Sequence, residues 1–152
     1  MTTQHVFEAA GLGLAPFRCV GMHTEVGPRN LGNGVSVGAP GQPMGCCDYC
    51  GTGILYCFEI VSTDGKAFIV GSDCVYKTGD AGLRKVVDAK LKAIKDEATD
   101  KRIRAGFDLF YSSDAIRAKL GESTCNYIDF CQKHAGRSGA LKCARMIEKA
   151  AE

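Results

Sequence analysis

The feature that most constrains this chain is the spacing of three cysteines around a predicted β-hairpin. Cys47 and Cys50 are separated by two residues and followed by Gly51, which is the spacing of a zinc knuckle. Two thiolates three residues apart on a tight turn can bind one tetrahedral ion, and the glycine lets the backbone turn beneath the sulfurs. The pattern therefore predicts that Cys47 and Cys50 bind the same metal ion.

The segment after the knuckle has the pattern of two antiparallel strands. The run ILYCFEIV (54–61) is rich in β-branched and aromatic residues, and KAFIV (66–70) returns after the turn sequence STDG. Because the strands are about equally long, the hairpin brings Cys74, at the start of a predicted short helix, back beside the knuckle. Knuckle, hairpin and helix cysteine follow one another as in a treble-clef zinc finger. We therefore expect Zn²⁺ at Cys47, Cys50 and Cys74.

The fourth ligand is less well defined. A treble clef usually places two ligands on its helix, three or four residues apart, but Lys77 and Thr78 occupy those positions. The replacement then comes from elsewhere or is water, which would leave the open position of a catalytic zinc. His23 and Cys19 lie on a predicted strand before the knuckle and can reach the site. Of the two, His23 is the favoured fourth ligand.

The same residues allow an enzymatic alternative. His23-Thr-Glu25 followed by Cys47-x-x-Cys50 resembles the signature of zinc deaminases, in which a histidine and two cysteines hold the ion and the glutamate shuttles protons. That histidine and glutamate belong on a helix, however, and glycines follow almost at once here. A zinc-dependent hydrolase or deaminase is thus the less favoured alternative, and no catalytic residue is predicted.

The remaining cysteines fit small buried side chains. Cys46 adjoins Cys47, so both are not expected on one ion, and Cys57 is expected in the hairpin core. Cys131-x-x-His134 has ligand spacing but lies on a predicted helix, where buried thiols are the simpler interpretation. For the knuckle itself, buried structural thiols remain an alternative to zinc, followed by redox chemistry and an iron–sulfur cluster.

The composition favours a protein of a reducing compartment. The chain has nine cysteines, an odd number, which argues against a disulfide framework. Its first residues lack the pattern of a secretory signal, and no apolar run approaches the ~20 residues of a membrane span. We expect a cytoplasmic protein without a membrane partner.

The expected fold is α+β in a single domain over residues 1–152. A glycine-rich segment with one short strand near 17–26 covers residues 1–45, the zinc-knuckle hairpin covers 46–79, and a helical region covers 80–152. In the helical region the apolar stripe changes phase near Asp100, which predicts a bend or break there. Four helices are expected in this half, with N-caps supplied by Ser112 or Ser113, by Ser123 or Thr124, and by Ser138.

Four short motifs carry a resemblance to a group of proteins. They are FEAAGLGLAPF, CDYCGTGI, DGKAFIVGSDCV and HAGRSGALK. In these the chain resembles small uncharacterised proteins of bacteriophages and mobile elements, which pair a CxxCG knuckle with a VGxxC segment and a helical tail. The resemblance implies a protein that acts inside a bacterial host cell, and Cys47, Cys50 and Cys74 are the positions that carry over.

The charge distribution bears on the partner. Residues 1–79 carry 4 basic and 6 acidic side chains, and residues 80–152 carry 15 and 11. A zinc module that binds nucleic acid is slightly favoured, and a protein-binding inhibitor or adaptor of a host factor is the alternative. No small-molecule substrate is expected. The candidate nucleic-acid-binding residues are Arg29, Lys90, Lys92, Lys95, Lys101, Arg102 and Arg104.

Overall fold

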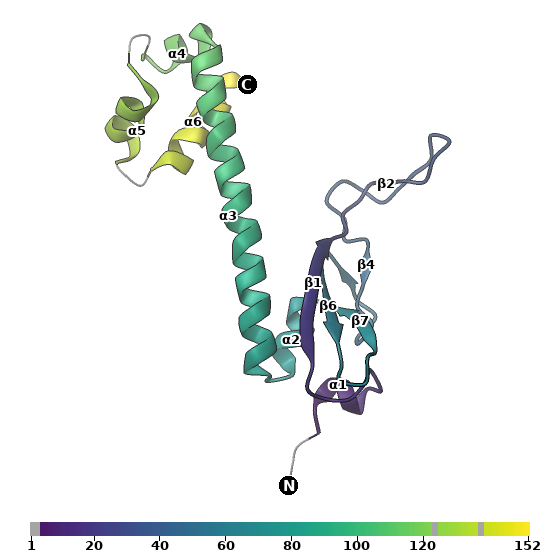
Figure 1. Cartoon of the computed structure of the whole chain (residues 1–152). Coiled ribbons are helices and arrows are strands. Elements are labelled where there is room, and N and C mark those ends of the chain that lie inside the picture. Colours follow the sequence, from purple (N-terminus) through teal and green to yellow (C-terminus); the bar gives the residue numbers. More distant parts are fainter. Residues whose placement is uncertain (1–3, 123–124, 137–138) are drawn as a thin grey trace. The chain divides into compact units, whose positions relative to one another are not determined.

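The computed structural model describes residues 4–122, 125–136 and 139–152 (Figure 1). It is α+β, as predicted, with small antiparallel sheets and a helical C-terminal half. The chain divides into two compact units, Met1–Leu91 and Lys92–Glu152, which we call the N-terminal and C-terminal units. The expectation of one domain over the whole chain stays a prediction.

The N-terminal unit is built on a three-stranded antiparallel sheet in the order β1-β6-β7. The strands are β1 (Arg18–Thr24), β6 (Tyr56–Val61) and β7 (Ala67–Val70), and Figure 1 shows them side by side. The hairpin β6–β7 is the one that the sequence predicts. Its turn is closed by a hydrogen bond from the Ser62 amide to the Lys66 carbonyl, and Gly65 has a positive φ of 83°.

One face of this sheet forms the core of the N-terminal unit. Phe58 and Ile60 alternate with outward residues on β6, as the two-residue period of a strand requires. The helix α1 (Val6–Ala9) adds Phe7, whose ring packs edge-to-face against Phe68 with 5.2 Å between centroids. Helix α2 (Ser72–Lys77) and the start of α3 (Ala81–Ser112) complete the core. Its other buried members are Phe17, Cys47, Val70, Cys74, Val75, Leu83 and Val87.

The chain before the β6–β7 hairpin contains more strand than the sequence predicts. Besides β1 there are two ladders of two residues per strand, β2 (Arg29–Asn30) with β3 (Ser36–Val37) and β4 (Gly45–Cys46) with β5 (Gly53–Ile54). Such short pairs carry almost no periodicity, so only tertiary context specifies them. The β4–β5 ladder leads directly into the knuckle.

The C-terminal unit consists of helices around a second apolar core. The end of α3 packs with α4 (Asp114–Lys119), α5 (Tyr127–Ala135) and α6 (Ala140–Ala151). Gly106 permits a close approach to α6, because a Cβ at this position would lie 2.8 Å from Ala144. Phe110, Phe130, Cys143 and Ile147 are fully buried.

Of the bend or break predicted near Asp100, the break is wrong, because α3 is continuous over its 32 residues. Its early apolar residues pack in the N-terminal core, and its late ones, from Phe110, pack in the C-terminal core. The phase of the stripe changes with the packing partner while the backbone stays helical. Ser113 caps α4 as predicted and Asn126 caps α5. The other expected caps, Ser123, Thr124 and Ser138, lie outside the described residues.

Candidate metal centre

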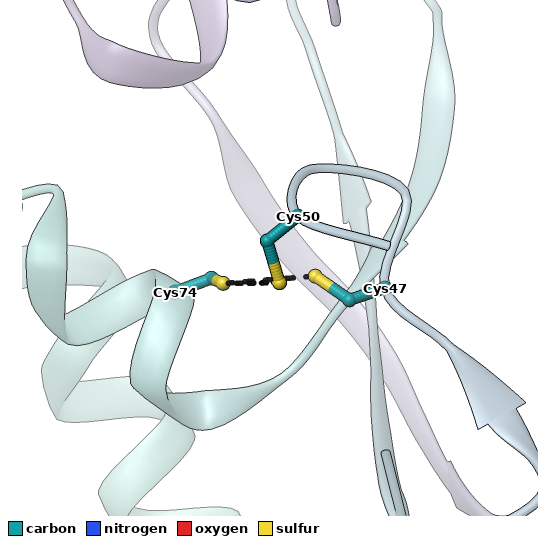
Figure 2. Close-up of side chains that lie close together, drawn as sticks. All are labelled: Cys47, Cys50 and Cys74. Carbon is teal, nitrogen blue, oxygen red and sulfur yellow. Dashed lines mark hydrogen bonds between the residues drawn. The ribbon is translucent and has the colours of Figure 1, made fainter. Parts of the chain in front are cut away.

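The three predicted ligand cysteines come from two local structures. Cys47 and Cys50 lie on the turn between β4 and β5, which is closed by a 2.7 Å hydrogen bond from the Gly51 amide to the Cys47 carbonyl. Gly51 has a φ of 71°, the left-handed conformation that glycine adopts without strain. Cys74 lies in the first turn of α2, just after β7. In Figure 2 the three side chains point toward one another.

The sulfur separations match a metal site. Cys47 Sγ lies 3.7 Å from Cys74 Sγ, and Cys74 Sγ lies 3.3 Å from Cys50 Sγ. A disulfide requires about 2.0 Å between sulfurs, whereas tetrahedral zinc with bonds of about 2.3 Å spaces its sulfurs about 3.8 Å apart. All three atoms lie within 4.8 Å of one another. The three thiols of this three-thiol group are therefore close enough to bind one metal ion.

The knuckle is held in place by the hairpin and not only by its sulfurs. The Asp48 amide donates to the Ile69 carbonyl at 2.8 Å, and the Ile69 amide donates to the Asp48 carboxylate at 2.6 Å. These two bonds fix the turn against β7, the strand that leads into Cys74. The ligands are thus brought together by hydrogen bonds between the knuckle turn and β7.

The pKa values of two of the thiols are shifted in opposite directions. Hydrogen bonds from Thr52, whose Oγ1 is 3.3 Å from the sulfur, lower the pKa of Cys50 to about 6. Burial raises the pKa of Cys74 to about 12, and its hydrogen bonds to Cys50 and Cys47 add to this. The lowered pKa of Cys50 favours the thiolate, which is the form that binds a metal ion.

A cavity of about 270 Å³ opens beside two of the sulfurs. Cys50, Thr52, Tyr56, Cys74 and Lys77 are among the residues that line it. Lys77 stands three residues after Cys74 on α2, where a treble clef places its second helix ligand. Within the ranges that the structure describes, the group of close donor atoms contains these three cysteines and no fourth His, Cys, Asp or Glu.

His23, the favoured fourth ligand, lies in a different group. On β1 it is paired in register with Cys57 on β6, and its ring lies near Glu25 and Glu59. Donor atoms of His23, Glu25 and Cys57 are within 4.8 Å of one another. The structure brings His23 and Glu25 to Cys57 and not to the three-thiol group. The set His23, Glu25, Cys47 and Cys50 of the deaminase alternative is likewise divided between the two groups.

Cys57 is the residue that sequence reasoning assigned to the hairpin core. Its neighbours Phe58 and Ile60 enter the core, so alternation directs Cys57 to the opposite face, where it is buried beneath the chain near Gly45. Alternation alone could have indicated this face. The pairing of β1 with β6, which supplies His23, is a long-range contact that no local pattern predicts.

The candidate nucleic-acid residues are dispersed. Arg29 and Lys90 belong to the N-terminal unit and the other five to the C-terminal unit. Arg29 pairs with Glu25, Lys92 with Asp96 and Arg102 with Glu148. Lys101 and Arg104 line a surface hollow that they share with Asp96, Glu97, Asp100 and Asp108. Their charges are therefore partly balanced by nearby carboxylates.

The spacing Cys131-x-x-His134 gives no metal group within the described part of the chain. His134 Nε2 lies 3.1 Å from the Glu122 carboxylate, and Cys131 packs against the C-terminal core. Cys131 is therefore a packed thiol, and His134 is a hydrogen-bonded imidazole.

Comparison with protein-family models, with curated proteins and with solved structures found no match. None of the described helices is both long and apolar enough to cross a membrane.

Proposed function

We propose that the three-thiol group binds one zinc ion and that the N-terminal unit is a treble-clef-like zinc module. The observation that carries the proposal is the sulfur geometry, with separations of 3.7 and 3.3 Å between thiols from a knuckle and a helix. A donor set made only of thiolates selects soft ions such as Zn²⁺ over Mg²⁺ or Ca²⁺. Lys77, at the second helix position, leaves the fourth ligand to water or another group.

The proposed role of the ion is structural. Cys47 and Cys74 are buried members of the N-terminal core, so an ion between them links the knuckle turn to α2 inside the packed interior. A small unit with short strands buries little apolar area. A bound ion that links its elements therefore supplies much of its stability. The module is thus proposed as non-enzymatic.

Metal analysis of the purified protein tests the site. Cys74→Ser and Cys47→Ser are expected to lose about one zinc ion per chain, whereas Cys46→Ser, next to the knuckle but outside the group, keeps it. If a variant folds poorly, Co²⁺ bound to the unaltered protein gives a second measurement, since thiolate ligation produces a strong charge-transfer absorption. The proposal would be overturned if Cys74→Ser kept its full metal content, or if Co²⁺ bound to the unaltered protein produced no thiolate absorption.

The proposed partner is nucleic acid in the cytoplasm of a bacterial cell. The basic residues of the helical region support it, because exposed ion pairs contribute little and can exchange for phosphate contacts. Affinity for DNA or RNA should fall steeply as salt rises, since phosphate contacts release counterions. Lys101→Glu and Arg104→Glu, tested singly, should each weaken binding, with Lys149→Glu as a charge-matched control. Absence of binding at low salt would exclude this partner.

A protein partner is the second candidate, and one observation favours it. The β2–β3 hairpin exposes three aliphatic side chains, Leu31 at 63%, Val35 at 53% and Val37 at 45%. Exposed apolar residues on a single small hairpin are typical of a protein-binding surface. A host protein should then be retained on the immobilised chain after nuclease treatment, and Leu31→Asp should abolish its retention. Retention that depends on intact nucleic acid would instead support the first candidate.

A further inference from the structure

The outward face of the β1–β6 pair carries a second set of metal-type donors. We propose that His23, Glu25 and Cys57, which we call the His23 group, bind a second zinc ion, independent of the one at the three-thiol group. The three donor atoms lie within 4.8 Å of one another. They combine an imidazole nitrogen, a carboxylate oxygen and a thiolate sulfur, each of which is a normal zinc ligand. The sulfur favours zinc over Mg²⁺ or Ca²⁺.

Backbone pairing places these donors on one face. His23 is directly opposite Cys57 in the antiparallel register, so their side chains project from the same side of the sheet. Glu25 is two residues beyond His23, and its amide donates to the Leu55 carbonyl at 2.9 Å, which continues the ladder. The two-residue period of a strand then returns the Glu25 side chain to the His23 face.

Neighbouring side chains orient the donors as in known metal sites. Glu59 Oε1 lies 3.0 Å from His23 Nδ1, and accepting that N–H leaves the Nε2 lone pair free. Nε2 faces Glu25 Oε1 at 3.2 Å. Arg29 binds the other carboxylate oxygen, Glu25 Oε2, at 2.7 Å. In zinc sites, the ligand histidine commonly donates its other ring N–H to a carboxylate. Ligand carboxylates are themselves held by hydrogen bonds.

Two glycines make room for the group. A Cβ at Gly45 would overlap Cys57 Sγ, and a Cβ at Gly21 would overlap the Glu59 carboxylate. Gly21 stands where the register of β1 shifts. Both positions therefore leave space for a ligand and for the carboxylate that orients His23.

Charge also favours a cation at this place. Glu25 and Glu59 flank His23, and Arg29 balances only one of these two carboxylates. The buried Cys57 thiol belongs to the same group of close donor atoms. A divalent ion bound by all three side chains accounts for the thiol as well.

Zinc stoichiometry of the full chain tests the proposal. After dialysis against buffered micromolar zinc, the unaltered protein is expected to hold about two ions per chain, and His23→Ala and Cys57→Ala about one. Cys19 lies on β1 with His23, is half-buried and belongs to neither group. Cys19→Ala should therefore retain both ions. His23 is partly exposed, so its variant keeps the test valid if Cys57→Ala fails to fold.

The outcomes separate this site from the three-thiol group. Loss of one ion in His23→Ala, together with loss of a different one in Cys74→Ser, supports two sites. One ion in the unaltered protein that only Cys74→Ser removes would overturn the second site and leave the first intact. A second ion that survives in both His23→Ala and Cys57→Ala would mean adventitious binding elsewhere and would also overturn it.

Discussion

The N-terminal and C-terminal units are stabilised in different ways, although α3 contributes residues to both. The N-terminal unit has a three-stranded sheet, two two-residue ladders, and both metal-type groups found among the described residues. The C-terminal unit has an apolar core of helices closed by caps and ion pairs. Metal dependence is therefore expected to be a local property of the first 91 residues.

Removal of the metal from the three-thiol group should produce the largest effect. In Cys74→Ser, the N-terminal unit should lose on the order of 5 kcal/mol or more of unfolding free energy, because metal binding and folding are coupled. Hydrogen exchange measured by mass spectrometry should show lost protection before Leu91 and retained protection after it. Cys46→Ser is the matched control. Equal loss of protection in both units would contradict a metal dependence confined to the N-terminal unit.

A substitution in the other core should show the converse. Phe130 is fully buried on α5, and Phe130→Ala should cost about 3–5 kcal/mol through lost burial and the cavity left behind. Denaturant unfolding measures this, and the metal content should not change. Ile128→Ala on the same helix, where the side chain is 66% exposed, serves as control and should stay within about 0.5 kcal/mol of the unaltered protein. Metal loss in Phe130→Ala would show that the two units are coupled.

A substitution that adds a ligand tests where the open position of the three-thiol group lies. Lys77 lines the same cavity as Cys50 and Cys74, so an imidazole there can supply the missing ligand. Lys77→His should tighten zinc binding about tenfold, or about 1.4 kcal/mol, in competition with a chromophoric chelator. Lys77→Ala removes the charge without adding a ligand. Equal affinities for the two variants would place the open position elsewhere.

The smallest effect is a pH dependence of the C-terminal unit. Hydrogen bonds from Lys133 and then His134 lower the pKa of Glu122 from 4.5 to about 2. The depressed folded-state pKa means that Glu122 contributes stability above pH 4.5, and that this contribution is lost as the pH falls toward 2. Glu122→Gln should reduce the slope of unfolding free energy over this range. Some slope should remain, because Arg102 lowers the pKa of Glu148 in the same direction. An unchanged slope would contradict the role of Glu122.

Local patterns predicted a large part of the N-terminal unit. The hairpin of β6 and β7 follows from β-branched alternation around a glycine turn, and β1 lies within the strand predicted near 17–26. Cys47, Cys50 and Cys74 come together because the β6–β7 hairpin returns the chain to the knuckle turn, which is bonded to Ile69 of β7. Each of these inferences depends on residues close in sequence, where spacing defines geometry.

Long-range contacts account for the errors. The apolar stripe of α3 changes phase near Asp100 because the helix packs in two cores. The sequence alone predicts a bend or break at this place. The position of His23 on the predicted strand before the knuckle favours it as the fourth ligand, but the β1–β6 register places it opposite Cys57. Residue type shows which atoms can bind a metal, and only strand pairing shows which of them meet.

The sequence by itself thus determined the α+β class, the β6–β7 hairpin and the convergence of three thiols, because each is specified within a short stretch of chain. Only the tertiary structure decided that α3 is continuous and that His23, Glu25 and Cys57 form their own group. The physical reason is that a shift of one residue in strand register moves every side chain to the other face of the sheet. That register depends on packing across the whole unit.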